Sequence, residues 1–152
     1  MDAAQALGEL AAAAHDDLGR LLLRASREVN HAAVERLHER GFTDVRPAHA
    51  AVLAHLDADG TRIVDLAHRA GLTRQAVAVT VRELVAAGYA DATADPADGR
   101  ASLVSLTPRG ATLCHTAAQV IRDEGARWGE RIGDPGLTDL LARLRALVDA
   151  AG

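Results

Sequence analysis

A polar helical face between residues 73 and 82 carries the side chains of this chain that are best suited to reading nucleic-acid bases. In the major groove, arginine bonds both acceptors of a guanine edge, and glutamine bonds the donor and the acceptor of an adenine edge. At helical spacing these side chains share one face, which comprises Thr73, Arg74, Gln75, Ala78 and Arg82. Val77, Val81 and Leu84 fall on the opposite side. The pattern therefore predicts an amphipathic helix with a base-reading surface.

The turn that would position this helix consists of Gly71, Leu72 and Thr73. Gly71 can adopt the left-handed conformation that ends a helix, and the Thr73 hydroxyl can cap the next helix. Leu72 is expected to fill the angle between the two helices. The helix before the turn presents an apolar stripe of Ile63, Leu66, Ala67 and Ala70. Two short helices around a glycine turn predict a helix-turn-helix, with an ordinary pair of packed helices as the alternative.

A β-hairpin is expected directly after these helices. Gly88 ends the second helix, residues 89–93 begin an extended segment, and residues 95–100 form a dense turn signal. Residues 101–106 alternate well enough to form the returning strand. A hairpin in this position is a wing, and Arg100 is the candidate for insertion into a narrow minor groove.

Composition limits the remaining possibilities. The length of 152 residues predicts one domain, with or without a helical extension. The chain is 49% hydrophobic but only 2% aromatic, so its core is built from small aliphatic side chains, and we expect it to bury further apolar surface by oligomerising. The net charge is −4, yet residues 61–110 sum to +1, so we expect modest, salt-sensitive affinity for nucleic acid. The single Cys114 excludes an internal disulfide framework and suits a cytoplasmic protein. Neither a secretory signal nor an apolar run of roughly 20 residues is present, so no membrane is expected as a partner.

Helices are predicted on both sides of this central region. Residues 3–40 read as one long helix whose apolar stripe needs another helix or another chain to cover it. A second helix is expected over Pro47–Leu56, where Arg46 occupies the cap position and Asp44 is a possible substitute cap. Thr107 and Pro108 begin a helix that runs to about Ile132, and the last helix spans Leu137–Ala150. The fold class is therefore mainly α with a small β-hairpin wing.

The order of these elements resembles the MarR family of bacterial transcription regulators. The wing of that family carries Asp-x-Arg, followed by a strand and a Leu-Thr-x-x-Gly helix start. Here the matching residues are Asp98, Arg100, Leu106, Thr107 and Gly110. The helix-turn-helix also fits the spacing of the family, through Leu66, Ala67, Gly71, Leu72, Thr73, Val77, Val81, Leu84 and Gly88. The resemblance covers nearly the whole chain.

The resemblance implies a homodimeric winged helix-turn-helix regulator that binds a palindromic operator on double-stranded DNA. Residues 1–40 and 109–152 would form a helical dimerisation region, and residues 45–108 the DNA-binding lobe. Arg100 would enter the minor groove, while Asp98 would brace the wing through an arginine partner. Val79 departs from the polar residue common in the family, and either contacts a thymine methyl or faces the lobe. The implied DNA-binding set is Thr73, Arg74, Gln75, Ala78, Val79, Arg82, Asp98 and Arg100.

Members of this family commonly bind small aromatic or phenolic effectors in a crevice, which here would be lined by the helices expected at 3–40, 47–56 and 108–132. Arg27, His31 and His38 share one side of the first of these and could hold an anionic effector, or could simply be solvated. Zinc sensing lacks a His-x-x-x-His pair, and redox sensing would need Cys114 to be an activated thiol rather than a buried structural one. No motif of an enzyme or of a cofactor site is present. The remaining alternative is a winged helix that binds another protein.

Overall fold

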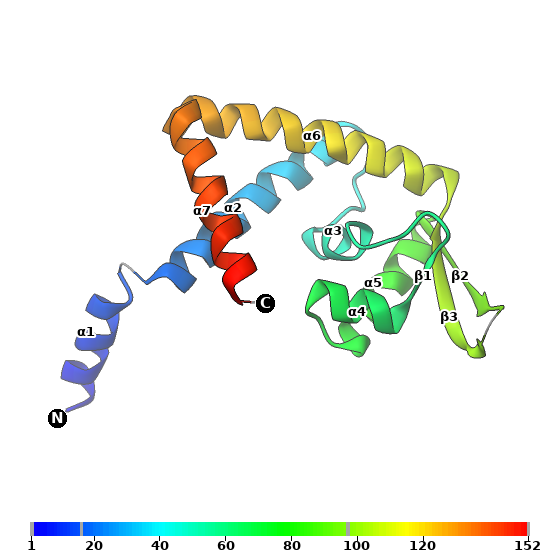
Figure 1. The fold of residues 1–152 in the computed structure, drawn as a ribbon, viewed down its shortest axis with the longest axis horizontal. Helices are drawn as coiled ribbons and strands as arrows, with labels where there is room; N and C mark the ends of the chain where they lie inside the picture. Colours follow the sequence, from blue (N-terminus) through cyan, green and yellow to red (C-terminus); the bar gives the residue numbers. More distant parts are fainter. Residues whose placement is uncertain (1, 16, 97, 152) are drawn as a thin grey trace.

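The computed structural model describes residues 2–15, 17–96 and 98–151. It is mainly helical, with one small antiparallel sheet, as predicted (Figure 1). The elements in chain order are α1 (Ala3–Ala13), α2 (Leu18–Glu39), α3 (Pro47–Leu53), β1 (Thr61–Arg62), α4 (Ile63–Ala70), α5 (Arg74–Ala86), β2 (Ala90–Asp95), β3 (Asp98–Leu106), α6 (Pro108–Ile132) and α7 (Asp134–Ala151). Helices α3 to α5 and the sheet gather into one lobe, over which α6 and α2 extend (Figure 1).

The helix-turn-helix is confirmed in its main features. Gly71 ends α4 in the left-handed conformation, at φ 64°. The Thr73 hydroxyl accepts a hydrogen bond from the Ala76 amide and caps α5. The prediction for Leu72 was wrong, because this side chain is 42% exposed and does not fill the angle between the helices. The apolar stripes instead meet inside the lobe, where Leu66, Ala67, Val77, Val81 and Leu84 are buried.

The sheet has the strand order β1-β3-β2, and the β2–β3 hairpin is the predicted wing. Ala90 lies opposite Leu106 and Ala92 opposite Val104, with an irregularity between Ala94 and Asp95. Strand β1 was not predicted, because two residues paired to β3 leave no periodic signal in the sequence.

The prediction of one helix over residues 3–40 was wrong. Helix α1 ends at Ala13, and α2 begins at Leu18 with Asp17 as its cap. The Asp17 carboxylate accepts a hydrogen bond from the Arg20 amide at 2.8 Å. A cap of this kind stabilises a new helix start and outweighs the apolar periodicity that continues across the break. Helix α1 projects away from the rest of the chain (Figure 1).

Helix α3 ends at Leu53 rather than Leu56, and its cap differs from the expectation. The Arg46 side chain makes no cap; instead His49 Nδ1 accepts from the Arg46 backbone amide at 3.3 Å. Asp44 does not replace it, because its carboxylate accepts a hydrogen bond from the buried Tyr89 hydroxyl and lies 3.5 Å from an Arg109 nitrogen.

The long helix α6 spans Pro108–Ile132, as predicted, and is capped by the Thr107 hydroxyl. Gly133 ends α6, but α7 begins directly at Asp134, three residues earlier than expected. Among the residues described, no helix combines the length and the hydropathy needed to cross a membrane.

Candidate nucleic-acid interface

The surface of α5 presents the predicted base-reading side chains to solvent. Arg74, Gln75 and Arg82 are exposed, and Ala78 is half-buried between them. The opposite face is anchored in the core, where Val77 and Leu84 are fully buried. The helix is therefore held rigidly from behind while its polar side is free to enter a groove.

Two further features of α5 bear on groove contacts. Val79 is 42% exposed, so it faces outward on the same helix and can reach a thymine methyl, and the lobe-facing alternative is not supported. Neither Arg74 nor Arg82 forms an ion pair with a carboxylate among the described residues. Their guanidinium groups thus keep their full capacity for phosphate or base contacts.

The wing is braced near its tip by an ion pair that was not predicted from the sequence. Arg62 on β1 contacts Asp95 at the end of β2, with 2.5 Å between Nε and Oδ2. The Asp95 carboxylate raises the pKa of Arg62 above its ordinary value, and the charge of Asp98 adds to this effect. The printed contact of Arg62 is with Asp95, and the bracing role implied for Asp98 stays a prediction. Arg100 lies on β3, and its side chain falls outside the part of the chain that the structure describes.

A second cluster joins the start of the wing to α6 and to the connector before α3. The Tyr89 ring is buried, its hydroxyl donates to Asp44, and the Arg109 guanidinium lies 4.8 Å from the ring centre. Burial is the main cause that raises the pKa of Tyr89, and the Asp44 carboxylate adds to it. Gly110 packs directly on the Tyr89 carbonyl, where a Cβ atom would collide with the backbone. This close approach gives a physical reason for glycine in the Leu-Thr-x-x-Gly pattern.

Helix α5, the second helix of the helix-turn-helix and here called the recognition helix, is tied to α3 through Glu83. Its two carboxylate oxygens contact different groups: Oε2 lies 3.1 Å from His49 Nε2, and Oε1 lies 3.3 Å from Arg46 Nη1. His49 is 1% exposed, whereas Arg46 is 65% exposed. The sequence reading missed this cluster, because the two ends are 34 residues apart.

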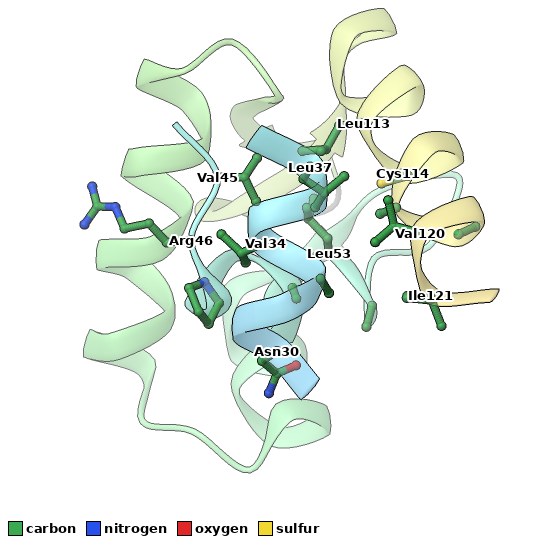
Figure 2. A pocket seen from close by; sticks show the side chains of 16 residues that line it. Asn30, Val34, Leu37, Val45, Arg46, Leu53, Leu113, Cys114, Val120 and Ile121 are labelled. Atoms are coloured by element: carbon green, nitrogen blue, oxygen red, sulfur yellow. The ribbon is translucent and has the colours of Figure 1, made fainter. Parts of the chain in front are cut away.

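A cavity of about 270 Å³ lies between the lobe and the long helices, where the effector crevice was expected (Figure 2). Its walls come from α2, α3 and α6, and they are mostly apolar. The lining residues are Asn30, Ala33, Val34, Leu37, Val45, Arg46, Pro47, Ala50, Leu53, Ala54, Leu113, Cys114, Ala117, Ala118, Val120 and Ile121. The guanidinium of Arg46 points away from the space that the other labelled side chains enclose (Figure 2).

The three side chains predicted to hold an effector lie elsewhere. His31 is exposed and lies 3.5 Å from Glu35, and His38 Nε2 contacts the Val45 carbonyl at 2.8 Å. Arg27 is exposed on α2. None of these three lines the cavity, because the cavity face of α2 is the one that carries Val34 and Leu37.

The cysteine and the histidines show where the sensing alternatives stand. Cys114 lines the cavity and is half-buried, and burial raises the pKa of its thiol. A raised pKa keeps the thiol protonated and slow to react. Within residues 2–15, 17–96 and 98–151, no three His, Cys, Asp or Glu side chains gather as they would around a metal ion.

A capped recognition helix, a glycine turn and a braced hairpin together define a winged helix-turn-helix protein. Residues 43–101 match the sequence model of the MarR family. A search of curated protein sequences gives no match.

Solved structures of MarR-type regulators have the same fold. A MarR-family transcriptional regulator from Rhodococcus sp. RHA1 is 27% identical, with a TM-score of 0.72 over 87% of this chain and 92% of that one. CouR from Rhodococcus jostii RHA1, bound to p-coumaroyl-CoA, is 28% identical, with a TM-score of 0.68 over the same shares. The transcriptional repressor CouR bound to a 23-mer DNA duplex is 25% identical, with a TM-score of 0.75 over 93% and 96%. Residues 43–101 are thus similar to the MarR family, and the fold over most of the chain is that of solved MarR-type transcriptional regulators.

Proposed function

We propose that this protein is a ligand-responsive repressor that binds a palindromic operator as a homodimer. The observation that carries the proposal is the exposed face of α5, where Arg74, Gln75 and Arg82 stand on a helix anchored by buried residues. The similar repressor CouR has been solved on a DNA duplex, which supports DNA as the partner of this chain. Such a regulator acts on the chromosome, in the cytoplasm.

Dimerisation is supported by helices that one chain leaves uncovered. Helix α1 has 11 residues and none of them is buried, yet isolated helices of this length are marginal in water. Helix α7 likewise exposes a leucine stripe. The large apolar side chains left exposed on these two helices are Leu7, Leu10, Leu140, Leu141, Leu147 and Val148. A second copy of the chain would cover them, with residues 1–40 and 109–152 as the dimerisation region and residues 45–108 as the lobe.

Two-fold symmetry would place the recognition helices in successive major grooves, roughly 34 Å apart. The operator would then be an inverted repeat whose half-sites are separated by about one helical turn.

The effector is proposed to occupy the apolar cavity between α2, α3 and α6. Its walls favour a ligand with an apolar, aromatic or aliphatic body. CouR, which binds p-coumaroyl-CoA, supports an aromatic acid or acyl derivative as the class to test first. Asn30 contributes the amide at the wall, but its Nδ2 is already bonded to Ser26 at 3.1 Å.

The test is selection of bound fragments from a random DNA pool, followed by fluorescence anisotropy on the enriched duplex. We expect an inverted repeat bound by a dimer, with Arg74→Ala flattening the preference at one position per half-site by about 1–3 kcal/mol. Arg122→Ala, an exposed change on α6, is the matched control and should keep the preference. A monomer in sedimentation, or no enriched sequence at low salt, would refute the proposal and favour a protein-binding winged helix.

A further inference from the structure

The short helix α3 is the wall between the cavity and the recognition helix. Pro47, Ala50 and Leu53 line the cavity. On other sides of the same helix, His49 and Val52 are buried, and α3 packs against α5. A ligand that enters the cavity therefore contacts α3, which also packs against α5.

The contact between α3 and α5 contains a polar clamp. Glu83 on α5 accepts from His49 Nε2 at 3.1 Å and pairs with Arg46 at 3.3 Å. His49 Nδ1 in turn accepts from the Arg46 backbone amide, which fixes the ring with its proton on Nε2. Glu83 is thus bonded to Arg46, which precedes α3, and to His49 in the first turn of α3.

The two arms of the clamp differ in strength. The His49 arm is shielded, because the imidazole is 1% exposed, and a hydrogen bond in such surroundings is stronger than one in water. The Arg46 arm is largely solvated, at 65% exposure, and exposed ion pairs contribute little. The His49–Glu83 bond therefore carries most of the connection.

We propose that the Arg46–Glu83–His49 clamp transmits occupancy of the cavity to the recognition helix. This inference rests on the proposed function, since it names the route by which an effector would release DNA. Packed interiors deform little, so a displacement of α3 passes to α5 wherever the two are bonded. Base contacts need side chains held within about 0.5 Å, so a small shift of α5 suffices to weaken them.

The chain offers a way to fill the cavity without knowing the effector. Cys114 is the single cysteine and lines the cavity. Its thiolate displaces methanesulfinate from benzyl methanethiosulfonate, which leaves a benzylthio group on the sulfur as a mixed disulfide. Labelling is run at alkaline pH, because burial raises the pKa of the thiol, and is confirmed by mass spectrometry. Cys114→Ala treated with the same reagent is the control.

The experiment compares DNA affinity before and after labelling in three proteins. In the parent protein the affinity should fall at least about fivefold, within the usual range of coupling between sites. Glu83→Gln keeps a neutral acceptor for His49 and should show a smaller ratio, since bonds to a charged partner are roughly twice as strong. Glu83→Met removes both arms and should bring the ratio close to one. Glu28→Gln, an exposed change on α2, should keep the parent ratio.

Hydrogen exchange of α5 amides, measured on the same samples without DNA, separates the clamp from the proposed function. Labelling should accelerate exchange in α5 of the parent protein, accelerate it less in Glu83→Gln, and have little effect in Glu83→Met. The clamp is refuted if α5 exchange does not respond to labelling, or responds equally in the parent and both Glu83 variants. Should α5 respond as expected while no DNA is bound, the clamp stands and the repressor assignment fails.

Discussion

Replacing Gly110 by alanine should destabilise the protein, whereas the same change at Gly125 on the same helix should not. At Gly110 an added Cβ would overlap the Tyr89 carbonyl oxygen and approach Leu106 Cδ2 to 3.1 Å. The carbonyl is backbone, so no rotamer change relieves the collision, and α6 must move away from the strand. At Gly125 nothing lies within 4 Å of the added atom.

The magnitudes follow from two opposing effects. Overpacking typically costs about 1–3 kcal/mol, and the backbone collision places Gly110→Ala at the upper end. Alanine in a helix interior gains about 1 kcal/mol over glycine, which reduces the net cost to about 2 kcal/mol. Gly125→Ala keeps only the gain. The two variants should therefore differ by about 3 kcal/mol in the free energy of unfolding.

Urea unfolding followed by circular dichroism measures this difference, at one fixed protein concentration because a dimer's stability depends on it. For a chain of this size each kcal/mol changes Tm by roughly 2–4 °C, so thermal scans provide a second reading. Equal stabilities for the two variants, or a Gly110→Ala protein as stable as the parent, would refute the packing argument at the Tyr89 carbonyl.

Three further predictions concern DNA, pH and the thiol. Arg100→Ala should weaken binding to all duplexes about evenly and lower the salt slope by about one, unlike Arg74→Ala; anisotropy at several salt concentrations checks this, and a sequence-dependent loss for Arg100→Ala would contradict it. The hydrogen bond from Arg69 lowers the pKa of Asp57 below its ordinary 3.8, so its contribution to stability is present above about pH 4 and lost as the pH falls through the lowered value. The free energy of unfolding of Asp57→Asn should therefore fall less than that of the parent as the pH is lowered from about 5 to about 3. Equal decreases in the two proteins would refute this. Cys114 should react with a colorimetric disulfide more slowly than free cysteine at neutral pH, because burial raises its pKa; a rate equal to that of free cysteine would show that the thiol is not shielded.

Local signals in the sequence were sufficient to predict α5 and the turn that precedes it. Gly71, Thr73 and the buried stripe through Val77 and Leu84 act within a few residues of one another, so their types and spacing already contain the physics of capping and amphipathic packing. The start of α6 at Thr107–Pro108 is local in the same sense.

One local signal was read incorrectly. The apolar steps of three and four run through residues 3–40, but Asp17 caps a new helix in the middle of them. Periodicity reports which side chains share a face, and it does not report whether the backbone hydrogen bonds are continuous. An aspartate two residues after His15 was the signal that could have located the break.

The contacts that position the site connect distant parts of the chain. Glu83 with His49, Asp95 with Arg62, and Tyr89 with Asp44 are 34, 33 and 45 residues apart. Each partner is an ordinary polar residue in its own segment, and nothing near it in sequence specifies the other.

The sequence by itself determined α4, α5, α6, the wing hairpin and the polar face of α5, because helix capping, helical period and turn chemistry are interactions between near neighbours. Only the tertiary structure decided that Glu83 joins α5 to α3, and that Val34 and Leu37 rather than His31 and His38 face the cavity. Those outcomes depend on how helices pack, and packing selects one face of each helix through the shape of all its neighbours together.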